Sequence, residues 1–227
     1  MDERSRFAGA FTFIELLVVM AVIAILITIA YPTYTGMLER GKATKDMSNL
    51  RQIGLATQGF INDNDGVLFS YTASWMSQLN PKYVASWAIF QSPFDKRPSS
   101  EAGDATTPIS YGVNVRIYPN NTPISSTRIT TPTGFILFAP AQNNAATVNF
   151  QGLATSAAPG VALLGNNNSV TSSPGGMATG GTHNNRTRIN ALFADLHCEN
   201  MAWTAFTSTT PSVAGQPDRW TPYSPYP

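Results

Sequence analysis

Cysteine, histidine and charge are all scarce in this sequence, and each shortage excludes a class of protein. A single cysteine, Cys198, among 227 residues allows no intrachain disulfide. Lysine and arginine number 14 against 13 acids, without a long basic run, so nothing in the sequence predicts strong electrostatic binding of nucleic acid. The polar character comes instead from Ser, Thr, Asn and Gly. Such a weakly charged surface suits a protein that packs beside copies of itself.

The short motifs of common enzyme sites are missing as well. The sequence contains no Gly-x-Ser-x-Gly, no HExxH and no Gly-x-x-x-x-Gly-Lys-Ser/Thr loop. Its glycine-rich run 175–181 lacks the preceding strand and following helix of a nucleotide-binding fold. Two histidines and few acids leave little for acid–base chemistry. We therefore expect a protein that is not an enzyme.

The N-terminal part changes character abruptly at Phe11. Residues 1–10 are polar, carry Arg4 and Arg6, and end in small residues. From Phe11 to Tyr31 the chain is almost wholly apolar, and as a helix it would extend about 32 Å, close to the thickness of a bilayer core. The two arginines orient the N-terminus to the cytoplasm. A secretory signal peptide is disfavoured because the small residues precede the apolar stretch.

Glu15 argues against a plain membrane anchor. A carboxylate four residues into the apolar stretch is unfavourable in hydrocarbon, and no cation follows within helical reach. Cleavage just before Phe11 would create an α-amino group about one helical turn away, in the same chain or a neighbouring copy. The position of Glu15 therefore predicts a role in assembly between copies.

A resemblance to the type IV prepilin signal of pilins and type II secretion pseudopilins lies in the run Gly9-Ala10-Phe11-Thr12-Phe13-Ile14-Glu15-Leu16-Leu17. It implies that a prepilin peptidase cuts between Ala10 and Phe11 and that Phe11 is then N-methylated. By the same likeness Glu15 is the assembly residue and Pro32 the helix-kinking proline. Ala10 stands where the family has glycine, so a cut after Gly9 is the alternative.

The resemblance also implies what the protein does. It implies a structural subunit of a type IV pilus or a type II secretion pseudopilus, and these two stay open. The implied partners are further copies in a helical homopolymer, the prepilin peptidase, an inner-membrane assembly platform and minor pilins. The subunit would wait in the inner membrane and then join a periplasmic or extracellular filament. The alternative is a membrane-tethered extracytoplasmic binding module.

Beyond the apolar stretch, Pro32, Gly36 and Gly41 mark a weak helical segment, read either as the end of the span or as a hinge. An apolar stripe then resumes at helical spacing, and the charged residues are expected mostly off it. The stripe consists of Ala43, Met47, Leu50, Ile53, Ala56 and Phe60, and the residues placed mostly off it are Lys42, Lys45, Asp46, Arg51 and Gln52. A turn at 62–66 ends the helix. A calcium loop there is disfavoured because the required glutamate is missing.

The remainder reads as short strands between turns and polar loops. The expected strands are Val67–Tyr71, Ile109–Ile117, Gly134–Ala139, Ile189–Ala194 and Cys198–Trp203, with a short helix at Trp75–Leu79. Motifs at 50–56, 62–66, 110–114, 135–139 and 190–195 resemble, in order, the G-type major pseudopilin-like proteins. The predicted fold is α+β, a pilin fold with a long N-terminal helix on a small antiparallel sheet. Its domains are a leader (1–10), a helix (11–61, with 11–31 in the membrane) and a head (62–227).

One group of side chains has the chemistry of a metal site. If two strands form a hairpin around its turn, Asp195 and His197 flank that turn, and His183 and Glu199 are the further donors. Such a set could hold zinc, or calcium by analogy with pseudopilins. The competing interpretation has Asp195 capping the turn and both histidines at the surface. Cys198 is expected to be a small buried residue beside Phe193 rather than a reactive thiol.

Overall fold

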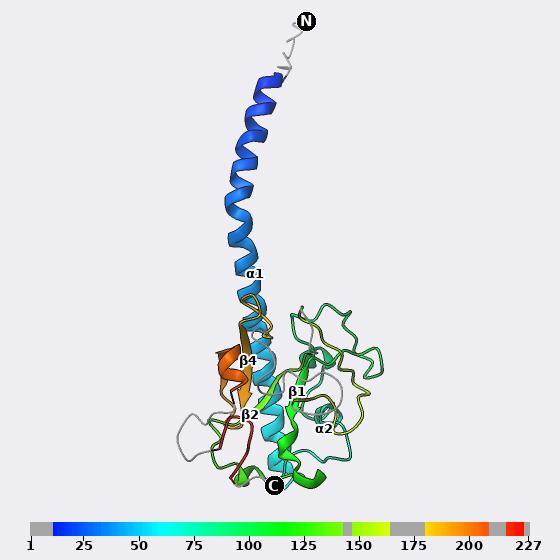
Figure 1. Ribbon diagram of the computed structural model, residues 1–227. Helices are drawn as coiled ribbons and strands as arrows, with labels where there is room; N and C mark the ends of the chain where they lie inside the picture. Colours follow the sequence, from blue (N-terminus) through cyan, green and yellow to red (C-terminus); the bar gives the residue numbers. More distant parts are fainter. Residues whose placement is uncertain (1–10, 143–146, 164–179, 209–216, 225–227) are drawn as a thin grey trace, which may run out of the picture. The chain divides into compact units, whose positions relative to one another are not determined.

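The computed structural model describes residues 11–142, 147–163, 180–208 and 217–224 (Figure 1). The chain forms two compact units, one up to Gly41 and one from Lys42 onward. A single long helix, α1 (Phe13–Asp63), runs from the first unit into the second. The strands of the described residues all belong to the second unit, the head.

Helix α1 ends where the sequence predicts. The amide of Gly66 donates to the carbonyl of Ile61 at 2.9 Å, and the Asn64 side chain donates to the carbonyl of Phe60. Gly66 has φ of 81°, a left-handed conformation that glycine adopts without strain. Asp63 pairs with Lys82 at 2.7 Å. This segment is therefore a helix-ending turn, as expected, and its first acid is already paired with a cation.

The head half of α1 buries the expected apolar stripe. Leu50 and Ile53 are fully buried, and Ala56 is nearly so. At Gly54 the helix approaches the sheet so closely that an added Cβ would lie 3.1 Å from Leu192. One expectation is wrong: Asp46 lies on the buried face, not off the stripe. Its position one turn before Leu50 puts it there, and polar partners make its burial tolerable.

Five strands form one sheet in the order β3-β1-β2-β4-β5. Among the strand pairs of the described residues, β1–β3 is parallel and the others are antiparallel. The strands are β1 (Tyr111–Asn114), β2 (Ile136–Pro140), β3 (Ala162–Leu163), β4 (Arg188–Phe193) and β5 (Cys198–Ala202). β1 and β2 are buried along their whole length, so the sheet lies in the centre of the head. The predicted α+β architecture, a long helix on a small and mostly antiparallel sheet, is confirmed.

Three of the five predicted strands, those that correspond to β2, β4 and β5, are confirmed to within two residues. The predicted strand at 109–117 is shorter because the side chain of Asn114 accepts from the amide of Arg116 and starts a 3-10 turn. The predicted strand at 67–71 is wrong. The amide of Leu68 bonds the carbonyl of Ile124, and the amide of Ser70 bonds the side chain of Gln78, so no strand ladder forms.

An aromatic cluster fills the head beside the sheet. Helix α2 (Trp75–Leu79) is present as predicted, and Trp75 lies 4.8 Å from Phe138 between ring centroids. The indole of Trp75 donates to the carbonyl of Val161, so its polar atom is satisfied. In Figure 1, α2 and its loops lie beside β1. The remaining short elements are η1 (Trp87–Phe90), η2 (Val115–Ile117), η3 (Pro119–Asn121), η4 (Ser126–Arg128) and α3 (Trp203–Phe206).

Candidate functional site

The beginning of α1 holds Glu15 in a reciprocal helix cap. The backbone amide and the hydroxyl of Thr12 donate to the Glu15 carboxylate at 2.8 and 2.7 Å. The amide of Glu15 in turn donates to the Thr12 hydroxyl at 3.3 Å. This is the capping box that a Thr-x-x-Glu sequence specifies. Our sequence analysis did not predict this capping box, although the three-residue spacing of Thr12 and Glu15 is its signature.

The cap fixes the carboxylate beside the residue where the mature chain is expected to begin. Phe11, which directly precedes Thr12, is 75% exposed. Glu15 is the only charged residue from Phe11 to Leu38. A cationic group brought to this end of the helix would therefore meet one acid whose orientation is already set.

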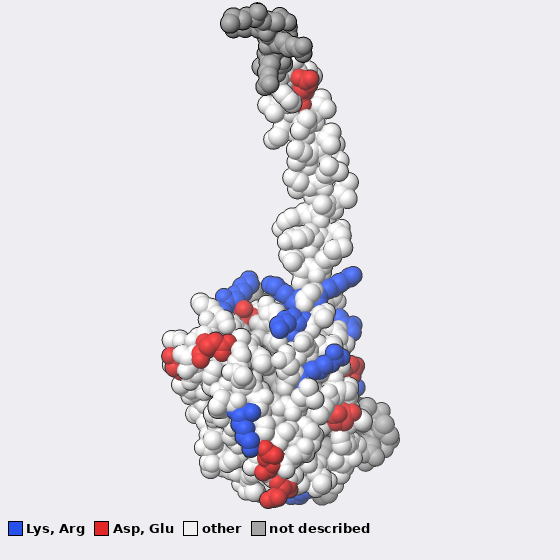
Figure 2. All heavy atoms as spheres, turned by 180° about the vertical axis from the view of Figure 1, so that it is seen from behind, with Lys and Arg blue, Asp and Glu red and all other residues white. Residues whose placement is uncertain are grey.

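The first unit of α1 presents its apolar side chains outward. An 18-residue window has a mean hydropathy of 2.9 and no buried residue, which makes the helix long and apolar enough to cross a bilayer. Figure 2 shows this stretch without charge apart from an acidic group near its beginning. The exposed large side chains are Phe13, Ile14, Leu16, Leu17, Val18, Val19, Met20, Val22, Ile23, Ile25, Leu26, Ile27, Ile29, Tyr31, Tyr34, Met37 and Leu38. Lipid or other apolar helices must cover such a surface.

Pro32 lies inside this helix. α1 is continuous through it, so the segment with Gly36 and Gly41 is helical rather than melted. Both glycines have nothing within 4 Å of an added Cβ and so lie in open space. A proline removes one backbone hydrogen bond and crowds the preceding turn. The kink at Pro32 and the hinge stay predictions.

The structure brings together two of the four side chains that are candidate metal ligands, Asp195 and His197. Asp195 and His197 lie in the turn between β4 and β5, with the carboxylate 2.5 Å from Nδ1 of His197. The imidazole also stacks on Phe193, with 4.3 Å between ring centroids. The predicted hairpin, with Asp195 and His197 at its turn, is confirmed.

His183 belongs to a different part of the head. It pairs with Arg188, the first residue of β4, whereas Asp195 and His197 follow the last residue of that strand. Its imidazole is buried, contacts the hydroxyl of Thr182 and the side chain of Asn200, and stacks on Phe94. Among the described residues no three His, Cys, Asp or Glu side chains are grouped as metal ligands.

The predicted contact of Cys198 with Phe193 stays a prediction, and its partner across the β4–β5 pair is Leu192. Cys198 is part-buried against the core, and its thiol lies 3.9 Å from the carbonyl of Met47 on α1. Burial raises the pKa of the Cys198 thiol to about 11. The thiol is therefore protonated at neutral pH and poorly nucleophilic, in line with the expected packing role.

A buried acid that sequence reasoning missed joins α1 to the sheet. Asp46 is fully buried, and its Oδ1 accepts from the hydroxyls of Ser92 at 2.5 Å and Tyr111 at 2.7 Å. Its Oδ2 accepts from the side-chain amide of Asn190 at 2.9 Å. No cation of the described residues forms an ion pair with it. Burial raises the pKa of Asp46, while the three donors oppose that rise.

This acid fixes the helix on the sheet. Asn190 also donates to the carbonyl of Ala43 on α1 and accepts from Asn200 on β5. Hydrogen bonds thus connect α1 to β1 through Asp46 and Tyr111, and α1 to β4 through Asp46 and Asn190. Each bond forms only when donor and acceptor are correctly placed. Such a network specifies one register of the helix on the sheet, which apolar contacts alone define less sharply.

Comparison with protein-family models gives a match on the N-terminal segment. Neither the curated proteins nor the solved structures contain a match to this chain. Residues 6–31 match the family model described as the prokaryotic N-terminal methylation motif. That segment includes Phe11, Glu15 and the whole apolar stretch from Phe11 to Tyr31. The chain therefore carries the cleavage and methylation signal typical of type IV pilins and pseudopilins, on an α+β, pilin-like architecture.

Proposed function

We propose that this protein is a structural subunit of a type IV pilin-like filament, in either a type IV pilus or a type II secretion pseudopilus. The observation that carries the proposal is the surface of the part of α1 that lies in the first unit of the chain, up to Gly41. It is an uninterrupted apolar helical surface without buried residues, it has one carboxylate in its first turn, and its first part lies within the match to the methylation motif. A lone anchor needs the apolar length but has no use for that acid.

Before assembly, the subunit is a single-pass protein of the inner membrane with its N-terminus in the cytoplasm. Prepilin peptidase cuts between Ala10 and Phe11 and methylates Phe11. The assembly platform then moves the subunit into a homopolymer whose helices form the apolar core. The new α-amino group of one copy neutralises Glu15 of its neighbour, which removes the penalty of a buried, unpaired carboxylate. Minor pilins are the further partners, and the heads lie outside.

The direct test is the N-terminus of polymeric material. Fibres sheared from cells should yield an N-terminal peptide that begins with methylated Phe11 by mass spectrometry. A peptide beginning at Ala10 would instead support the cut after Gly9. The alternative, a membrane-tethered binding module, predicts an uncleaved chain beginning at Met1 that stays monomeric in detergent extracts.

A Glu15 variant separates assembly from membrane insertion. Glu15→Ala should insert normally but lower filament yield by about tenfold or more, because losing one partner of a buried ion pair costs about 3–5 kcal/mol. Thr28→Val is the matched control, since it changes a polar side chain that bonds only its own helix within the same stretch. Wild-type filament yield from Glu15→Ala would refute the role given to this acid.

A further inference from the structure

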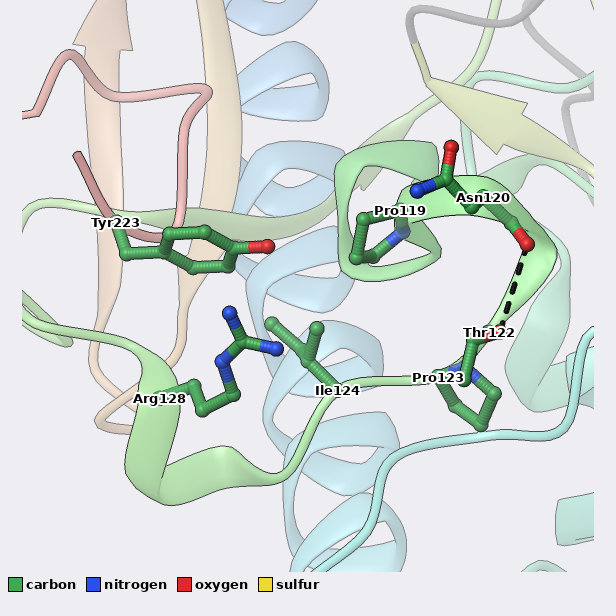
Figure 3. Close-up of a pocket in the computed structure, with 7 residues that line it drawn as sticks. All are labelled: Pro119, Asn120, Thr122, Pro123, Ile124, Arg128 and Tyr223. Carbon is green, nitrogen blue, oxygen red and sulfur yellow. Dashed lines mark hydrogen bonds between the residues drawn. The ribbon is translucent and has the colours of Figure 1, made fainter. Parts of the chain in front are cut away.

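A pocket of about 300 Å³ lies in the head away from the strands. Its wall comes from the turns η3 and η4, the loop between them and a segment near residue 223, none of which belongs to a strand (Figure 3). The lining residues are Pro119, Asn120, Thr122, Pro123, Ile124, Arg128 and Tyr223. The volume is at the small end of the range for ligand sites, about 300–1,000 Å³.

Arg128 is the only charged residue in this lining. Its guanidinium lies over the ring of Tyr223, 4.4 Å from the centroid, which holds the group in place. No carboxylate of the described residues forms an ion pair with it. By contrast, Arg97 is paired with Asp95 and Arg116 with Asp218. The pocket therefore presents an oriented cation to which an incoming anion can bind.

The rest of the lining is apolar and rigid, with polar groups at the edge. Two proline rings and the buried side chain of Ile124 form apolar walls, and Figure 3 shows Tyr223 facing Pro119 across the opening. Asn120 and Thr122 add an amide and a hydroxyl at the rim. Asn120 has φ of 52°, a left-handed conformation that asparagine tolerates well.

The backbone beneath the pocket offers little to a ligand. The amide of Ile124 donates to the carbonyl of Ile117, and its carbonyl accepts from the amide of Leu68. A peptide that binds by adding a strand needs a row of unpaired backbone groups, and the lining supplies no strand edge. Recognition must therefore come from side chains: one fixed guanidinium, apolar ring faces, an amide and a hydroxyl.

We propose that this pocket binds an acidic saccharide, with a uronate carboxylate on Arg128 and the sugar ring between Tyr223 and the two prolines. A pyranose has apolar C–H faces that suit Pro119, Pro123 and Ile124, and hydroxyls that suit Asn120 and Thr122. The guanidinium takes a carboxylate in a two-pronged arrangement. The proposal does not depend on filament assembly, because every residue involved lies in the head.

The test is ligand-observed NMR on the full chain in detergent micelles, with empty micelles as the blank. The probes are glucuronate, its uncharged methyl ester, glucose, acetate and a short acidic peptide. Glucuronate should bind with a dissociation constant on the order of 1 mM, as befits a ligand of this size. The ester, glucose and acetate should each bind about fivefold more weakly or worse, and added salt should weaken glucuronate binding.

The variant Arg128→Gln keeps a side chain of similar length without the charge and should lose the preference for glucuronate over its ester. Lys96→Gln removes an exposed cation elsewhere in the head and should leave binding unchanged. Equal binding of glucuronate and glucose, unchanged binding by Arg128→Gln, or no binding at all would overturn the proposal. Tighter binding of the acidic peptide would assign the pocket to a protein partner and also overturn it. The comparison of glucuronate with its methyl ester uses the wild-type protein, so it tests the role of the carboxylate even if a substitution disturbs the fold.

Discussion

Asp46 of α1 accepts a hydrogen bond from the phenolic hydroxyl of Tyr111 of β1 at 2.7 Å, in a site where both side chains are fully buried. The bond is one of three that neutral donors make to this carboxyl. It links the helix that carries the assembly signal to the second strand of the sheet order. The attachment of the head to α1 thus depends on a polar group as well as on the apolar stripe.

Removing this acid should destabilise the head strongly. Asp46→Ala leaves three buried donors without their acceptor, and we expect a loss of about 2–4 kcal/mol in the free energy of unfolding. Tyr111→Phe removes one donor and should cost about 1–2 kcal/mol. The measurement is guanidinium unfolding of the full chain in detergent, followed by tryptophan fluorescence.

Tyr118→Phe is the matched control for Tyr111→Phe. The hydroxyl of Tyr118 is also buried, but it has no hydrogen-bond partner among the described residues. Its removal should therefore be neutral or slightly stabilising. Equal losses from the two Tyr→Phe changes would show that the bond to Asp46 contributes nothing beyond ring packing.

Asp46 should also make stability depend on pH in the direction opposite to that of a salt-bridged acid. Burial raises its pKa above 3.8, so between 3.8 and the folded-state pKa the folded protein holds a proton that the unfolded chain releases. Stability should therefore fall as pH rises through that window, by up to about 1.4 kcal/mol per pH unit, and level off above it. The difference between the wild type and Asp46→Asn, measured from pH 4 upward, isolates this contribution. Parallel pH profiles for the two proteins would contradict it.

Periodicity and turn chemistry were enough to predict the main elements. The stripe through Leu50 and Ile53 placed the helix, and the residues around Asp195 placed the β4–β5 hairpin. β3 has two residues and is too short to show a periodic pattern. The charge of Asp46 predicts an exposed side chain, whereas its position one turn before Leu50 puts it on the buried face.

Part of the candidate site can be predicted from the sequence, and part of it depends on the fold. The signal around Phe11 and Glu15 is local in sequence and could be identified without a structure. The cap between Thr12 and Glu15 could have been predicted from its spacing. The pocket could not, because it depends on the fold to bring Tyr223 beside residues 119–128, nearly a hundred positions earlier.

Gly54 should tolerate no branched side chain. Its missing Cβ leaves room for both terminal methyl groups of Leu192, at 3.1 and 3.2 Å from the position a Cβ would take. Gly54→Val should therefore cost about 1–3 kcal/mol through overpacking. The double variant Gly54→Val/Leu192→Ala should lose less stability than the sum of the two single losses, because the methyl groups of the valine fill the cavity that Leu192→Ala leaves.

Gly41→Ala is the control for the backbone effect of replacing a helical glycine. Nothing lies within 4 Å of its added Cβ, so the change should stabilise the helix by up to about 1 kcal/mol. Both variants are compared by thermal unfolding of the full chain in detergent. If Gly54→Val and Leu192→Ala prove simply additive, the two side chains do not share the space that the structure assigns to them.

Cys198 should resist thiol reagents in the folded protein. Burial raises its pKa from 9.0 to about 11, which lowers the thiolate fraction at pH 8 by about a hundredfold. Reaction with a disulfide reagent should be slower by a similar factor than in the chain unfolded in guanidinium. Matching rates in the two states would mean that the thiol is accessible and ordinary.

Thr12 should affect assembly through Glu15 rather than by contact with a neighbour. Its hydroxyl and amide hold the carboxylate against the beginning of α1, where the α-amino group of a second copy is proposed to meet it. Thr12→Val keeps the shape and removes the hydroxyl, so the cap weakens by about 1 kcal/mol and filament yield should fall about fivefold. Thr12→Ser restores the hydroxyl and should restore the yield. Sheared fibre is measured relative to membrane-inserted subunit, so that insertion defects cancel.

Because Glu15→Ala removes the charge itself, it should lower the yield further than Thr12→Val, and the double variant should behave like Glu15→Ala alone. Additive losses in the double variant would show that Thr12 acts on assembly independently of Glu15.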